Sequence, residues 1–286
     1  MKISNYAHIL TIASLKGGGA LLNLGITFLV MNRASPADAG KFLFILSAVY
    51  IYSYIARLGS DNFIVKSFSS LSGAATNKEN ATYSSLLLAC LIIPLTSLPI
   101  LTITTDLSLK EAISTLAIIS FYSVTQVNSR FSQAKSKIVQ ASLSMSAYVP
   151  AFFISLFLIV SNSSTEASIG LLLTIYLASS FASAALSTKY KKICKFKILE
   201  LKQEYKECFS FFSTGLIGIL ILWGGSFYAG YALPFQDVGQ LSASQRITVS
   251  INLILVAISL YASPIISREF KSSGTKALIA TIAQCN

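Results

Sequence analysis

The sequence predicts an all-α integral membrane protein with about eight transmembrane helices and a cytoplasmic N-terminus. Charged residues make up only 12% of the 286 positions, and hydrophobic residues make up 53%. Soluble domains carry about 25% charged residues, so this low value indicates that most of the surface avoids water. The apolar residues also gather in runs of about 20, the length that a helix needs to cross a bilayer core of about 30 Å. These observations argue against an ordinary soluble domain.

Eight runs meet this length or approach it. The first has too little positive charge before it and is too long for a cleaved signal peptide. The third contains Pro94 and Pro99, which neighbouring helices tolerate inside a membrane. The fourth is the shortest. The runs cover residues 6–31, 42–63, 83–104, 112–127, 141–160, 169–187, 209–233 and 247–266.

The connections between the runs are polar. Residues 33–41 contain Ser35, Pro36, Asp38 and Gly40 and are expected to form a turn. Residues 189–207 are rich in lysine and form the longest polar stretch. We expect this stretch to be a basic cytoplasmic linker that divides the chain. An N-terminal six-helix bundle would then occupy residues 1–188, and the first two helices of a second bundle would lie in residues 208–286.

Lysine and arginine fall unequally on the two sides of these runs. With the N-terminus inside, sixteen of the 22 cations lie in cytoplasmic stretches and four in outer stretches. Cytoplasmic loops of membrane proteins accumulate Lys and Arg, so this bias predicts the orientation. It also accounts for the net charge of +11, which therefore need not indicate nucleic-acid binding. We expect the basic loops to lie against anionic phospholipid.

A short motif occurs twice. Asp38-Ala-Gly40 follows the first run, and Asp237-Val-Gly239 follows the seventh. Both preceding runs contain glycines, Gly17–Gly19 in one and Gly215 and Gly218 in the other. Internal repeats of this kind are common in transporters, so we expect the second bundle to be related to the first.

Charged and amide side chains inside the runs are costly, so each is a candidate site residue. The candidates are Lys16, Arg57, Arg246, Arg130, Gln126 and Asn128. Lys16 lies about ten residues into its run, where it either faces a cavity or reaches the surface along its own stem. Arg57 lies four residues before Asp61, so the two can form a local ion pair on one helix face, or Arg57 can contact a phosphate. Arg246 and Arg130 are placed at run ends, where ordinary interfacial anchoring is the alternative. No histidine or cysteine cluster predicts a metal or another cofactor.

The order and spacing of several motifs resemble those of a known family. The motifs are Lys16-Gly17, Arg33-x-x-Pro36-x-Asp38-x-Gly40-Lys41-Phe42, Arg57-Leu58-Gly59 and Asp237-x-Gly239-x-x-Ser242-x-x-Gln245-Arg246. The sequence is similar here to bacterial polysaccharide flippases of the O-antigen type, in the multidrug/oligosaccharidyl-lipid/polysaccharide (MOP) exporter superfamily. The resemblance covers most of the chain. Members usually have at least twelve helices, so the resemblance implies that the second bundle is incomplete, through truncation or because another chain supplies the rest.

The resemblance implies a transporter in the bacterial inner membrane, and not an enzyme. Its cargo would be an undecaprenyl-diphosphate-linked oligosaccharide, a repeat unit for O-antigen (lipopolysaccharide), capsule or exopolysaccharide, which alternating access carries between the leaflets. Members are expected to couple transport to a proton or sodium gradient and to work beside a polysaccharide polymerase and other export proteins. The positive candidates suit a diphosphate, because Arg binds phosphate oxygens in pairs and Lys acts as a point charge.

Three alternatives remain at this point. A membrane enzyme would want acids or His/Arg clusters on a sizeable outer loop, but the predicted outer loops are short. A drug or cation antiporter of the same superfamily is expected to need a carboxylate within the membrane, where none of the eleven acidic residues is predicted to lie centrally. The third alternative is an inactive fragment or an assembly component of a polysaccharide export system.

Overall fold

The chain folds entirely into helices within the part that the computed structural model describes, residues 3–69, 77–104, 107–160, 166–188 and 202–251. This confirms the predicted fold class. The helices are α1 (Ile3–Arg33), α2 (Pro36–Ala56), α3 (Ser60–Phe68), α4 (Asn77–Ile92), the 3₁₀ helix η1 (Ile93–Ser97), α5 (Leu98–Thr104), α6 (Leu109–Ala134), α7 (Ile138–Ser146), α8 (Tyr148–Val160), α9 (Ile169–Ser187), α10 (Lys202–Ala232) and α11 (Phe235–Ile251).

Several helices are long and apolar enough to cross a membrane. In the described residues there are five, Ser14–Arg33, Pro36–Ala56, Glu79–Ser97, Ile169–Ser187 and Cys208–Ala232, and the pair α7 and α8, bent by 47°, adds a sixth. These six correspond to six of the eight predicted runs, so the chain is a multi-pass membrane protein.

The two remaining predicted runs have different outcomes. Residues 112–127 lie inside α6, a longer helix of 26 residues that is not apolar enough to be among these spans. Its buried positions include Ser123, Thr125 and Asn128, which is why its sequence looks weak as a span. The last run, 247–266, lies mostly outside the described residues, as does most of the predicted linker. α10 already begins at Lys202, inside that linker.

The turn predicted at residues 33–41 extends only over Ala34 and Ser35, because both copies of the repeated motif form the first turns of helices. Ser35 caps α2 by accepting a hydrogen bond from the backbone N–H of Asp38 at 3.2 Å, and Pro36 occupies the first turn. Proline and acidic residues are favoured at a helix N-terminus, which explains why this turn-like composition begins a helix. Asp237 likewise lies in the first turn of α11.

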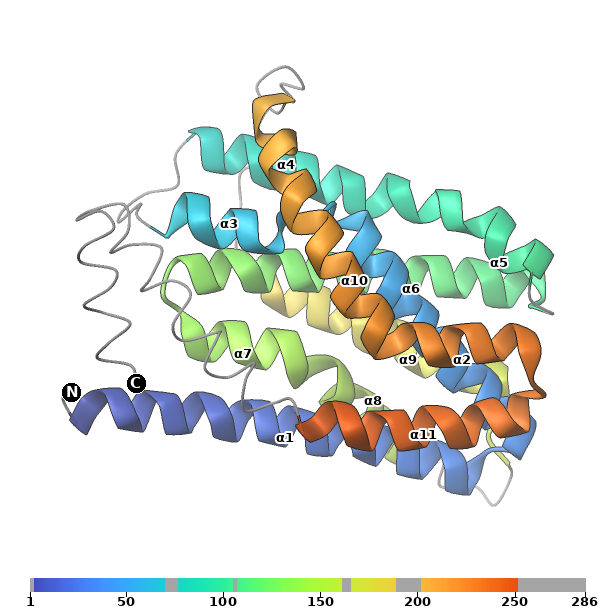
Figure 1. The fold of residues 1–286 in the computed structure, drawn as a ribbon. Coiled ribbons are helices and arrows are strands. Elements are labelled where there is room, and N and C mark those ends of the chain that lie inside the picture. Colours follow the sequence, from blue (N-terminus) through green and yellow to red (C-terminus); the bar gives the residue numbers. More distant parts are fainter. Residues whose placement is uncertain (1–2, 70–76, 105–106, 161–165, 189–201, 252–286) are drawn as a thin grey trace.

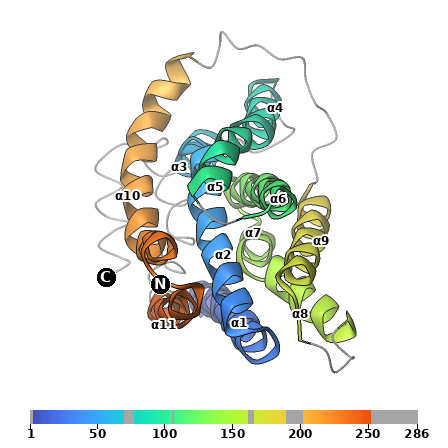
Figure 2. The ribbon, with the colours of Figure 1, turned by 90° about the vertical axis from the view of Figure 1, so that its right-hand side faces the viewer.

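The centre of the structure is α2, which packs on α10 and α11 on one side and on α6 on the other (Figures 1 and 2). It is 78% buried as a span, whereas the span in α10 is 6% buried. The core formed around α2 includes Phe42, which stacks on Phe153 at 5.7 Å, and Phe44, which stacks on Phe227 at 5.5 Å. α2 therefore joins the α10–α11 pair to the remaining helices.

One end of the bundle is closely packed, and we call it the packed end. Here α1 and α10 end, and α2 and α11 begin. Gly40 and Gly239, the matching residues of the repeated motif, lie against each other, and a Cβ on Gly40 would collide with the carbonyl of Phe235. The two copies of the repeated motif are thus in contact, since only glycine allows the two backbones to come so close.

The predicted run 42–63 is broken near its C-terminal end. α2 ends at Ala56 and α3 begins at Ser60, with Leu58 at φ 52° and Gly59 at φ 68° between them. Gly59 also lies against the backbone of Phe212 in α10, where a Cβ would not fit. The left-handed pair ends the helix here, because an α-helix cannot continue through positive φ values.

Candidate functional site

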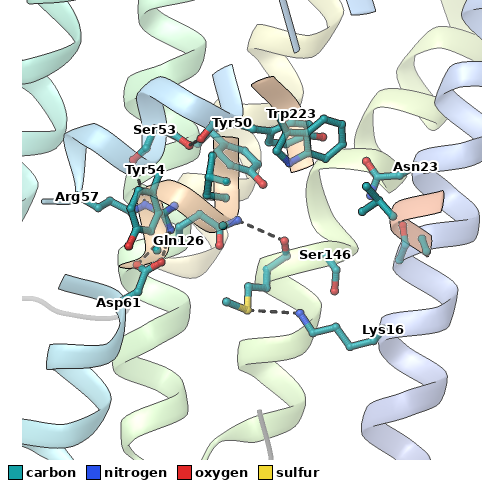
Figure 3. A pocket seen from close by; sticks show the side chains of 18 of the residues that line it. Lys16, Asn23, Tyr50, Ser53, Tyr54, Arg57, Asp61, Gln126, Ser146 and Trp223 are labelled. Atoms are coloured by element: carbon teal, nitrogen blue, oxygen red, sulfur yellow. Dashed lines mark hydrogen bonds and ion pairs between the residues drawn. The ribbon is translucent and has the colours of Figure 1, made fainter. Parts of the chain in front are cut away.

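A cavity of about 470 Å³ lies between α1, α2, α3, α6, α7, α10 and α11 (Figure 3). It receives side chains from parts of the chain that are up to about 230 residues apart in sequence. Five of the six predicted site residues line it: Lys16, Arg57, Gln126, Arg130 and Arg246. Volumes of this size are typical of sites for small molecules.

An ion cluster occupies one side of the cavity. Nη1 of Arg57 lies 3.2 Å from Oδ1 and 3.1 Å from Oδ2 of Asp61, and Nε of Arg57 donates to the carbonyl of Ser53 at 3.0 Å. Nη2 of Arg130 lies 3.7 Å from the same Asp61 carboxylate. The local ion pair, one of the two alternatives for Arg57, is present in the structure, but it forms across the break between α2 and α3 and not on one helix face.

Lys16 faces the cavity from α1, which is the first of the two alternatives that the sequence left open for it. Its side chain is buried, and Nζ donates to Sδ of Met145 at 3.4 Å. A thioether is a weak acceptor and carries no compensating charge. Among the described residues no carboxylate lies within salt-bridge distance of Lys16. Burying an ammonium in this way is costly, and an anion in the cavity would remove that cost.

The lining residues carry a surplus of positive charge. Among the lining residues that the structure describes, the cations Lys16, Arg57, Arg130 and Arg246 face one carboxylate, that of Asp61, which leaves a net charge of +3. A concave site with walls of low dielectric constant concentrates such a potential. The arrangement can therefore attract and hold an anion with several negative charges.

Aromatic rings form a second region, which we call the aromatic layer: Tyr50, Tyr122 and Trp223. Tyr50 lies 4.5 Å from Trp223 and 5.6 Å from Tyr122, measured between ring centroids. The guanidinium of Arg246 lies over Trp223 at 5.3 Å and over Tyr50 at 5.9 Å, in cation–π geometry. Arg246 was expected to open a helix at the membrane surface. Because α11 begins at Phe235, it lies well inside the helix instead.

Asn128 lies away from the lining residues. It accepts a hydrogen bond from the Tyr83 hydroxyl at 2.7 Å and donates to Ser187 and Thr188 at 3.1 Å each. These contacts join α4, α6 and the end of α9. By contrast, its neighbour Gln126 reaches the cavity and donates to the carbonyl of Met145 at 3.3 Å.

Sequence reasoning missed the aromatic layer, although a signal was present. Tyr50 precedes Arg57 by seven residues, and Tyr122 precedes Arg130 by eight. Residues at these spacings share one helix face, so the position of each arginine pointed to a tyrosine two turns away. Asn23, seven residues after Lys16, lines the cavity by the same rule.

The described residues contain no group of three or more His, Cys, Asp or Glu side chains that could hold a metal ion. Cys90 and Cys208 are buried thiols. Both belong to an apolar cluster with Phe63 and Phe131, away from the residues that line the cavity.

Comparison with known proteins gives one family. A family model described as "Polysaccharide biosynthesis protein" matches residues 6–270. No curated protein and no solved structure matches the chain significantly. The matched segment includes every residue that lines the cavity. Because the match covers most of this multi-pass helical chain, the chain belongs to the polysaccharide biosynthesis protein family.

Proposed function

We propose that this protein carries an undecaprenyl-diphosphate-linked oligosaccharide across the bacterial inner membrane by alternating access, as a flippase and not as an enzyme. The observation that carries the proposal is the cavity, whose described lining residues have a net charge of +3 and in which buried Lys16 has no described carboxylate within salt-bridge distance. The family supports membrane transport of polysaccharide precursors in general. Such precursors carry a diphosphate, which is the kind of anion that this cavity suits.

The diphosphate would bind at the ion cluster. Arg57 and Arg130 already converge on one carboxylate group, Asp61, so their guanidinium groups are placed to hold phosphate oxygens instead. Lys16 adds a point charge from α1. In this arrangement Arg246 lies in the aromatic layer and acts on another part of the cargo.

The predicted orientation of the chain implies which side of the membrane the cavity faces. With the N-terminus in the cytoplasm, the packed end lies on the periplasmic side, and the cavity lies on the cytoplasmic side of it. The structure then corresponds to the state that loads cargo. Residues 1–188 and 208–286 act as two lobes joined by the basic linker, and the contact between Gly40 and Gly239 supports a closure in which equivalent parts of both lobes meet.

The remaining assignments follow from the same proposal. A proton or sodium gradient drives the return of the empty carrier. The basic cytoplasmic stretches bind anionic phospholipid, and a polysaccharide polymerase receives the cargo together with other export proteins. A drug or cation antiporter is the rival function. It would need surplus negative charge in the cavity, where Asp61 is outnumbered by four lining cations.

The cavity contains the single tryptophan of the sequence, Trp223, which makes a direct test simple. Farnesyl diphosphate is titrated into the detergent-solubilised chain while tryptophan fluorescence is recorded, with farnesol as the uncharged comparison. We expect saturable quenching by the diphosphate only. The triple variant Lys16→Gln, Arg57→Gln, Arg130→Gln should weaken binding about 100-fold or more, since each charged contact contributes more than 1 kcal/mol.

The matched control removes three exposed cations outside the cavity, in the triple variant Arg33→Gln, Lys110→Gln, Lys137→Gln. It changes the net charge equally and should bind as the wild type does. Unchanged binding by the cavity variant would overturn the proposed cargo site. A tight response to an organic cation such as tetraphenylphosphonium, without one to the diphosphate, would favour the antiporter.

A further inference from the structure

We propose that the aromatic layer, Tyr50, Tyr122 and Trp223, binds the first sugar of the cargo, the one bonded directly to the diphosphate. This inference rests on the proposed function and adds a second subsite to it. Nothing in the family match names such a site. The case depends on where the rings lie, how open they are and what holds them.

The aromatic layer lies at a fixed depth relative to the ion cluster. Tyr50 and Arg57 are separated by seven residues of α2, and Tyr122 and Arg130 by eight residues of α6. At 1.5 Å per residue both separations are about 10–12 Å along the helix axes. Both helices run away from the packed end (Figure 1), so the rings lie on its side of the arginines. This offset suits a diphosphate followed by one sugar ring.

The three rings differ from the aromatic residues of the core. Phe42, Phe44 and Phe153 are fully buried, whereas Tyr50, Tyr122 and Trp223 are partly exposed and line the cavity. Tyr50 and Tyr122 pack against the core and also reach the cavity. Their open surface is apolar, and each ring carries one polar group, a hydroxyl or an indole N–H. A sugar presents the complementary surface, a face of C–H bonds edged by hydroxyl groups.

Arg246 acts as a positioning residue for this layer. Its guanidinium lies over Trp223 and Tyr50, which come from different helices, and so it fixes the two rings relative to each other. The amide of Asn23 lies across the cavity at a similar level in Figure 3. Its Nδ2 donates to the carbonyl of Gly19 at 2.9 Å, which holds the side chain in place.

The packed end limits how far the cargo can penetrate. No residue of α1 after Leu24, of α2 before Tyr50 or of α10 after Trp223 lines the cavity. The aromatic layer is therefore its last level before the contact between Gly40 and Gly239. A cargo whose diphosphate lies at the ion cluster can place its first sugar, and not its lipid, on these rings.

The experiment compares bare and glycosylated lipid diphosphates on the full chain in detergent, by isothermal titration calorimetry. The probes are farnesyl diphosphate and its glucosyl, galactosyl and N-acetylglucosaminyl derivatives. We expect at least one glycosylated probe to bind the wild type about tenfold more tightly than the bare diphosphate, an amount typical of good aromatic contacts. Trp223→Leu should reduce this preference to within about twofold, and Trp223→Phe should keep most of it.

The affinity for the bare diphosphate supplies the internal control, because Trp223→Leu should leave it unchanged. Tyr228→Leu removes a lipid-exposed ring from the same helix and should keep the full sugar preference. The inference is overturned if no glycosylated probe is preferred, if Trp223→Leu keeps the preference, or if that variant weakens all probes equally. If the bare diphosphate itself fails to bind the wild type, the proposed cargo is wrong, and the sugar subsite falls with it.

Discussion

The helix α2 meets α10 and α11 at two places that look nothing alike. At the packed end, Gly40 and Gly239 let the backbones of α2 and α11 touch. Farther along, the larger side chains of Tyr50, Trp223 and Arg246 lie between the same helices and line the cavity. The difference lies in side-chain size, because all three helices continue through both places. The same helices thus form a tight contact between Gly40 and Gly239, which we call the seal, and the cavity, which we call the chamber. Each can be altered separately.

The largest effect is expected from breaking the seal. Gly40→Val places a side chain where the Phe235 carbonyl lies, so α2 and α11 must separate. Overpacking of this kind should destabilise the protein by about 3 kcal/mol. Thermal unfolding in detergent measures the change. Gly225→Val in α10 adds the same side chain at an exposed position with open space around it and should have little effect. Equal losses in the two variants would show that the seal is not a special contact.

The next prediction changes Asp61, the one carboxylate among the described residues that line the cavity. Asp61 pairs with Arg57 and Arg130, and in the proposed cargo site it would compete with the diphosphate for both. Asp61→Asn should therefore tighten farnesyl diphosphate binding about fivefold, roughly 1 kcal/mol. Asp237→Asn, at the exposed start of α11, makes the same charge change outside the cavity and should have no effect. Weaker binding by Asp61→Asn would mean that this carboxylate holds the arginines in their binding positions.

The sequence alone predicts part of this comparison. Hydrophobic runs predicted the helices, and the cost of charge in a membrane identified Lys16, Arg57 and Arg246. The repeated Asp-x-Gly motif was recognised, yet its two copies were assigned to turns, because Ser, Pro, Asp and Gly are common both in turns and at helix starts. That the copies touch each other is a tertiary fact, and no local pattern contains it.

The cavity shows the same limit. Gln126 and Asn128 are two residues apart on α6, so they point to different sides of the helix. Gln126 reaches the cavity and Asn128 the contact with α4 and α9. Polar character made both residues candidates, but only the packing of neighbouring helices decides which side faces the cavity. The break at Leu58 and Gly59 was likewise hidden inside an apolar run.

A smaller effect tests the charge of the chamber without any mutation. Iodide and caesium ions both quench tryptophan fluorescence, and the protein has only Trp223 to quench. The surplus positive charge should make iodide at least about twofold more effective than caesium, relative to free tryptophan, at low salt. The ratio should fall toward that of the free amino acid as inert salt is raised, because salt screens the potential. A preference for caesium would contradict the charge assigned to the cavity.

The smallest effect concerns an ion pair beside the seal. Lys41 of α2 bonds both carboxylate oxygens of Glu111 at 3.1 Å, and Glu111 also forms a capping box with Ser108. Burial opposes ionisation, but the hydrogen bonds from Ser108 and Lys41 outweigh it and lower the pKa of Glu111. A lowered folded-state pKa stabilises the protein above the unfolded value of about 4.3. That stability is lost as the pH falls through the folded value.

The loss should be about 0.5 kcal/mol, within the range measured for single ion pairs at partly exposed positions. Glu111→Gln should therefore unfold with a weaker pH dependence than the wild type below about pH 5. Thermal unfolding between pH 3 and pH 7 measures both proteins. Identical pH profiles would show that the pair contributes nothing to the packed end.

The contrast in burial between α2 and α10 also predicts which of the two helices tolerates more substitutions during evolution. Every face of α2 touches another helix, the cavity or the seal, so nearly any replacement disturbs a neighbour. Most of α10 needs only to remain apolar. Drift among relatives should therefore accumulate on the outward side of α10, while α2 and the glycines that it meets stay nearly fixed. A lineage that acquires a new glycan would then adapt through the few α10 positions that face inward, Trp223 first among them.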